Sequence, residues 1–92
     1  MPGDVRLIQL ARILALDPAT LSHDAARAAI SERPADLASA ILREAADNDD
    51  VTSTAAALDY LESRLAELGD LIDEQAAVAI REGFARRLRA WE

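Results

Sequence analysis

The sequence predicts an all-α protein, a compact bundle of four to five helices that ends in an antiparallel helical hairpin. Hydrophobic residues make up 51% of the 92 residues but aromatic residues only 3%, so a core must consist mainly of Leu, Ile, Val and Ala. Ala and Leu both favour helix. Only three glycines and three prolines occur, and no β-branched residues alternate with polar ones as in a strand. We expect a single domain over residues 1–92.

The first expected helix, 5–16, is apolar around most of its circumference. Its polar residues are only Arg6, Gln9 and Arg12, which share one narrow stripe at i, i+3 spacing, and Asp4 is a suitable N-cap. Apolar surface of this extent must be shielded from water. We therefore expect this helix to lie at the centre of the bundle or to be shared across a two-fold interface.

Prolines and capping residues divide the next part of the chain. Asp17-Pro18 ends the first helix, because proline disfavours helical geometry at the residue before it. Ser22 can cap a helix, and Pro34 interrupts the pattern again. The expected helical segments are 18–21, 23–32 and 35–46.

Two further helices, 53–68 and 71–91, are expected to form the C-terminal hairpin. The first carries leucines at alternating three and four spacing, the a/d pattern of helix packing, at Leu58, Leu61, Leu65 and Leu68. Gly69 suits the left-handed position that ends a helix, and Asp70 can cap the next one. The alternative is one helix that continues through Gly69, since a single internal glycine costs only about 1 kcal/mol.

The charge balance favours a basic partner. The formal net charge is −7, which repels nucleic acid and anionic membranes, so nucleic-acid binding is not expected. No uncharged stretch approaches the roughly 18 to 20 residues that span a bilayer, and no secretory signal is recognisable, so we expect a cytoplasmic location and no membrane association. The expected acidic partner surface consists of Asp47, Asp49, Asp50, Asp70, Asp73 and Glu74.

These features predict a small acidic protein–protein interaction module of the adaptor, inhibitor, immunity or chaperone type, self-associating as a homodimer. The chain has no cysteine and one histidine, so we expect no disulfide, no thiolate nucleophile, no metal site and no cofactor, and no enzymatic activity. The expected interface residues are Leu7, Leu10, Leu14, Leu58, Leu61, Leu65, Leu68 and Trp91.

One alternative is histidine phosphotransfer. Ser22-His23-Asp24, with Arg27 beyond it, resembles the S-H-D/E-x-x-R box of histidine kinase dimerisation helices, and the resemblance implies that His23 could carry a phosphoryl group. Arg27 lies one place late for that box, and His23 falls in the first turn of its helix. If this reading holds, His23 is the exception to the absence of enzymatic chemistry.

A second alternative is a helix-turn-helix regulator of DNA. Residues 23–46 contain two consecutive expected helices, and the second would be the reading helix. Its polar residues are Asp36, Ser39, Arg43 and Glu44, of which two are acidic.

A third alternative rests on the C-terminal third of the chain. This part resembles the dimerising helical hairpin at the C-terminus of modular polyketide synthase subunits, on Leu58-Asp59, Leu61-Glu62, Leu65-Ala66, Leu68, Val78-Ala79, Arg81 and Trp91. The final helix is about half a turn longer than in that pattern, and no third docking helix follows. The resemblance implies a dimerising docking element.

Overall fold

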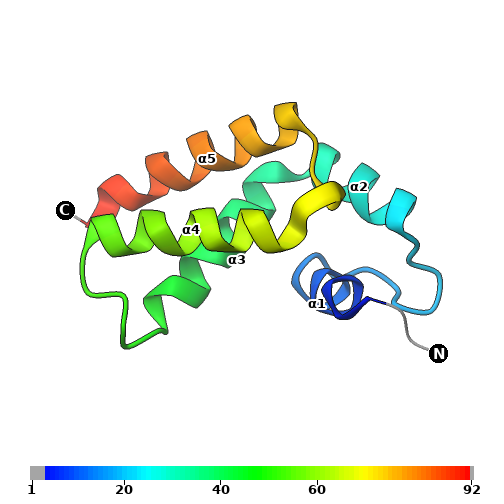
Figure 1. Ribbon diagram of the computed structural model, residues 1–92, viewed down its shortest axis with the longest axis horizontal. Coiled ribbons are helices and arrows are strands. Elements are labelled where there is room, and N and C mark those ends of the chain that lie inside the picture. The colour runs from blue at the N-terminus through cyan, green and yellow to red at the C-terminus, as the bar shows by residue number, and fades with distance from the viewer. Residues whose placement is uncertain (1–3, 92) are drawn as a thin grey trace.

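The computed structural model describes residues 4–91, and in this range the chain is helical without any strand. These residues form five α-helices, which are labelled in Figure 1, and two short 3₁₀ turns. The helices are α1 (Val5–Ile13), α2 (His23–Glu32), α3 (Pro34–Ala46), α4 (Thr54–Leu68) and α5 (Glu74–Leu88), and the turns are η1 (Gly69–Leu71) and η2 (Arg89–Trp91). The predicted all-α bundle is confirmed.

Helix α3 lies at the centre of the bundle. It packs against both α4 and α5, which run antiparallel beside one another as the predicted hairpin (Figure 1). The most extensive contact between two helices is that of α3 with α5, where Gly83 faces Ala38: a Cβ atom on Gly83 would lie 3.4 Å from the Ala38 Cβ atom. The largest fully buried side chains are Leu10, Leu14, Ile30, Leu37, Ile41, Leu61, Leu71, Ile80 and Phe84.

Helix α1 does not take the central position that its composition suggested. It lies at one end of the molecule (Figure 1) and buries Leu10 and Ala11, with Leu14 just beyond it. Its opposite side is open, with Val5 65% and Ile8 47% exposed. Helix α3 occupies the centre instead, because it is longer than α1 and packs against both helices of the hairpin.

The first helix is also shorter than expected, and the segment after it is not helical. Ala15 has a left-handed backbone with φ 56°, and the Leu16 N–H donates to the Ala11 carbonyl at 2.8 Å, the bond of a Schellman motif. Helix α1 therefore ends at Ile13 instead of residue 16. The segment expected as a helix at 18–21 forms a turn, in which the Ala19 N–H donates to the Asp17 carboxylate at 2.9 Å.

The hairpin turn forms at Gly69 as predicted, but a different residue caps the second helix. Gly69 has φ 51° and follows the last residue of α4, which excludes one continuous helix. Ile72 then has an extended backbone, and the Asp73 carboxylate, not that of Asp70, accepts from the Ala76 N–H at 2.7 Å. The last helix therefore begins at Glu74 instead of residue 71. The other predicted caps, Asp4 and Ser22, are present.

We expect Ala15→Gly to raise the free energy of unfolding by up to about 1 kcal/mol, because glycine removes the steric cost of a left-handed backbone at the end of α1. Urea denaturation followed by circular dichroism measures the change. Ala28→Gly, at an exposed site inside α2, is the control and should lower stability by about 1 kcal/mol. Equal losses in both variants would contradict the role assigned to Ala15.

The contact between α3 and α5 leaves no room for a large side chain at position 83. We expect Gly83→Leu to lower stability by about 1–3 kcal/mol through overpacking. Gly83→Ala should be nearly neutral, because its tight contacts with Ala38 and the flexible end of Arg87 offset the gain in helix propensity of about 1 kcal/mol. Thermal unfolding of the two variants provides the test, and a fully tolerated leucine would show that the helices can separate.

Candidate functional site

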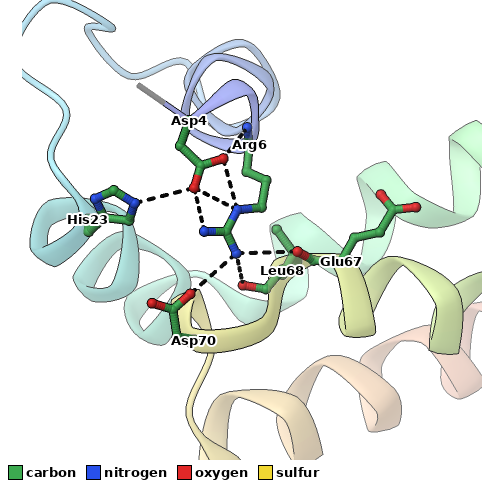
Figure 2. Close-up of polar contacts among 6 residues, drawn as sticks. All are labelled: Asp4, Arg6, His23, Glu67, Leu68 and Asp70. Carbon is green, nitrogen blue, oxygen red and sulfur yellow. Dashed lines mark hydrogen bonds and ion pairs between the residues drawn. The ribbon is translucent and has the colours of Figure 1, made fainter. Parts of the chain in front are cut away.

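Two features of the structure bring polar side chains from distant parts of the chain together: a charged cluster at the start of α1 and a hollow in the hairpin. Figure 2 shows the charged cluster, in which the Arg6 guanidinium pairs with the Asp4 carboxylate through its Nε and Nη2 atoms. The same carboxylate accepts from the Arg6 backbone N–H at 2.9 Å and caps α1. Asp4 thus both begins the helix and orients Arg6.

The other side of the Arg6 guanidinium contacts the end of α4. Its Nη1 atom donates to the Leu68 carbonyl at 2.8 Å and the Glu67 carbonyl at 3.3 Å, and lies 3.3 Å from an Asp70 carboxylate oxygen. The last carbonyls of a helix have no partner within the helix, and a cation stabilises them. Arg6 therefore joins α1 to α4 by satisfying the C-terminus of α4.

These contacts shift the ionisation of both partners. Hydrogen bonds from Arg6 hold the pKa of the Asp4 carboxyl well below its ordinary value, and the bond from His23 adds to this effect. The hydrogen bonds with Asp4 raise the pKa of Arg6 in turn. Because both groups keep their charges over the whole neutral range, the cluster acts as a fixed structural clamp.

The phosphotransfer hypothesis gains no support from the position of His23. The imidazole is exposed at the start of α2, and its Nε2 atom lies 3.3 Å from an Asp4 carboxylate oxygen (Figure 2). A phosphoryl group on Nε2 would face the Asp4 carboxylate, and like charges at such distances repel. His23 is better described as a partner of Asp4.

The second feature is an open hollow of about 300 Å³ between α4 and α5, next to the hairpin turn. Its apolar lining comes from both helices and the turn: Leu65, Ala66, Ile72 and Ala77. Its charged lining is Glu62, Asp73, Glu74 and Arg81. The sequence analysis named Leu65, Asp73 and Glu74 as candidate site residues, and Glu62, Ala66 and Arg81 only within the polyketide synthase resemblance. It did not predict that these residues line one hollow, because they become neighbours only when the hairpin folds.

An ion pair closes one side of this hollow. The Arg81 guanidinium donates from Nε and Nη2 to the two Glu62 carboxylate oxygens, both at 2.9 Å. These hydrogen bonds lower the pKa of Glu62 and raise that of Arg81. Arg81 is thus neutralised by Glu62, and Asp73 and Glu74 remain as the negative side of the hollow.

A further groove, of about 330 Å³, lies where α1 meets α3 and α4, and is lined by Gln9, Arg12, Ile13, Glu44 and Arg64. Arg64 is already paired there, at 3.2 Å with Glu44 and 2.9 Å with Glu67. Its positive charge is therefore matched by carboxylates of the chain itself.

The predicted acidic residues do not form one surface. Asp47, Asp49 and Asp50 belong to the connection before α4, whereas Asp70 and Asp73 belong to the hairpin turn after it and Glu74 is the first residue of α5. Helix α4 has 15 residues, so about 22 Å of helix separates the two groups. Of these six residues, Asp73 and Glu74 line the hollow between α4 and α5.

Most of the predicted interface leucines are used inside the chain. Leu10, Leu14, Leu61, Leu65 and Leu68 are buried in the core, and Leu7 is partly buried against it. Leu58 and Trp91 remain exposed, at 42% and 41%. Val78, which is 49% exposed on α5, was not among the predicted interface residues.

The helix that a helix-turn-helix regulator would insert into DNA is covered here. Helix α3 buries Leu37, Ala38, Ile41, Leu42 and Ala45 and packs against α4 and α5. A reading helix must project from its domain to enter a groove. This arrangement does not favour the DNA-binding hypothesis.

Residues 4–91 contain no group of three or more metal-ligating side chains, and no helix among them is long and apolar enough to cross a membrane. Comparisons with protein families, curated proteins and solved structures gave no significant match to this chain.

We expect Asp4→Asn to lower the free energy of unfolding at neutral pH and to keep the helix cap. Asparagine caps helices as well as aspartate does, but it cannot form the ion pair with Arg6. The unfolded carboxyl titrates near its ordinary pKa of about 3.9, and the folded one well below it. The contribution of the Asp4 carboxylate to the free energy of unfolding is therefore complete above the pKa of the unfolded chain. It is lost as the pH falls toward the lower pKa of the folded chain.

Urea midpoints measured from pH 7 to pH 2 test this expectation. The difference between the native chain and Asp4→Asn should be constant near neutrality and shrink below about pH 4. Asp59→Asn, an exposed carboxylate within α4, is the control and should cause little change. Repeating the series with His23→Gln removes the other titratable contact of Asp4. A difference that persists unchanged to pH 2 would contradict the clamp.

Proposed function

We propose that this chain is a protein–protein interaction module of the adaptor, inhibitor, immunity or chaperone type, which binds through the outer face of its α4–α5 hairpin. The observation that supports this proposal is the position of two exposed apolar side chains. Leu58 lies one turn from Glu62 on α4, and Val78 one turn from Arg81 on α5. Residues three or four apart share a helix face. Leu58 therefore shares a face of α4 with Glu62, and Val78 a face of α5 with Arg81, the two residues of the ion pair that lines the hollow.

The combination of apolar side chains and charge is typical of a binding surface. A partner that covers Leu58, Val78 and the floor of the hollow removes apolar area from water, which is the main favourable term in association. The charged residues around it supply selectivity and association rate more than affinity. A binding role therefore accounts for the exposed apolar side chains, the hollow and the charged residues of this face.

The partner that fits best is basic. The net charge of −7 attracts a positively charged protein and repels a second copy of the same chain. Five of the eight residues predicted for a homodimer are already buried in the core. Val5 and Ile8, which are exposed on α1, are one surface through which two copies could still associate. Dimerisation through the hairpin, as the polyketide synthase resemblance implies, would have to use the outer face, because most leucines of the seam are buried.

A photocrosslinking amino acid placed at Leu58 or Val78 tests this proposal in cells of the source organism. Both positions should capture the same protein, of basic isoelectric point. The control carries the crosslinker at Ala28, which is exposed on α2, away from the hairpin, and should not capture it. Equal capture at all three positions, or none at Leu58 and Val78, would overturn the proposal, and capture of a second copy would replace the basic partner with a homodimer.

A further inference from the structure

We propose that the hollow between α4 and α5 receives one amphipathic helix of the partner, with an aliphatic side chain seated on the floor of the hollow and a lysine or arginine beside Glu74. This inference rests on the proposed function and specifies the chemistry of its partner. The groove between two antiparallel helices is a natural seat for a third helix, whose apolar residues at i, i+3, i+4 and i+7 enter the groove.

The floor of the hollow requires an apolar occupant. The apolar half of its lining consists of Leu65, Ala66, Ile72 and Ala77, which offer no side-chain hydrogen-bonding group. Two alanines leave the space that larger residues would fill. A volume of about 300 Å³ is at the lower end of the range for binding pockets, so the hollow has room for one or two aliphatic side chains.

The rim of the hollow requires a cation. Glu62 and Arg81 satisfy each other, and one oxygen of Asp73 is occupied by the Ala76 N–H. Glu74 forms no side-chain hydrogen bond or ion pair with any residue in 4–91, and Asp73 forms no ion pair in this range. The side of the hollow nearest the turn therefore carries two carboxylates, Asp73 and Glu74, that no cation of residues 4–91 pairs with, and a lysine or arginine of the partner supplies that cation.

The sequence of the occupant follows from these two requirements. Its aliphatic residue must be followed or preceded within one turn by a basic residue, so that one contacts Ala66 and Ala77 while the other reaches Glu74. Further apolar residues one and two turns away would meet Leu58 or Val78. An acidic amphipathic helix, or a basic segment without apolar residues, lacks one half of this complementarity.

Three synthetic peptides of about 16 residues, four to five helical turns, serve as probes. The first is an amphipathic helix of Leu, Ala and Lys, the second replaces Lys by Glu, and the third replaces Leu by Ser. Fluorescence anisotropy gives the affinities, and amide chemical shifts of the protein locate the site. Only the first peptide should bind, with its largest shifts at Ala66, Ile72 and Ala77, and its binding should weaken between about 50 mM and 300 mM salt because ionic contacts are screened.

Two protein variants of equal charge complete the experiment. Ala66→Arg fills the hollow with a large cation and should weaken binding of the first peptide by about tenfold or more. Ser63→Arg adds the same charge at an exposed site one turn away on α4 and should change the affinity little. Unchanged circular dichroism in both variants shows that α4 still folds.

Each other result overturns the inference. Equal binding by Ala66→Arg and Ser63→Arg excludes the hollow, and equal binding of the acidic peptide excludes the cation requirement. Shifts confined to Leu58, Val78 or α1 place the peptide elsewhere. Concentration-dependent dimers that Ala66→Arg dissociates would make a second copy the occupant. These failures leave the interaction through the outer face standing, because the crosslinking at Leu58 and Val78 tests that function independently.

Discussion

The close packing of α3 against α5 is the contact on which the rest of the structure depends. With 3% aromatic residues, the chain has few bulky side chains to bridge wide gaps, so its helices must approach closely to exclude water. Gly83 on α5 and Ala38 on α3 permit this approach. Aliphatic residues on either side, such as Leu37, Ile41 and Ile80, are then fully buried and form one continuous core.

This packing also determines which surfaces are left for other molecules. Because α3 packs against both α4 and α5, three leucines of the α4 seam, Leu61, Leu65 and Leu68, are buried within the chain. The outer side of the hairpin keeps what α3 does not cover: Leu58, Val78 and the hollow above Leu65. The candidate binding face is therefore a consequence of how the core is built, and one of its charged residues, Asp73, is also the N-cap of α5.

The N-terminal helix is attached by a different kind of interaction. Helix α1 buries one apolar side and leaves Val5 and Ile8 in solvent, and two arginines fix its ends. Arg6 satisfies the last carbonyls of α4, and Arg33 donates to the Leu14 carbonyl at 2.7 Å. A short helix with limited apolar burial gains its orientation from such directed bonds, which its composition alone did not reveal.

The sequence by itself determined the features that depend on neighbouring residues. Helix content followed from Ala and Leu, and the starts at Asp4 and Ser22 and the stop at Gly69 followed from capping chemistry that acts within one turn. Only the tertiary structure decided that α3 and not α1 is central, that Ala15 ends α1, and that Glu62 meets Arg81 across the hollow. These outcomes depend on how helices distant in sequence align with one another. A helical pattern shows which side of a helix is apolar, but several helices here have such a side, and only packing selects which sides meet and which remain in water.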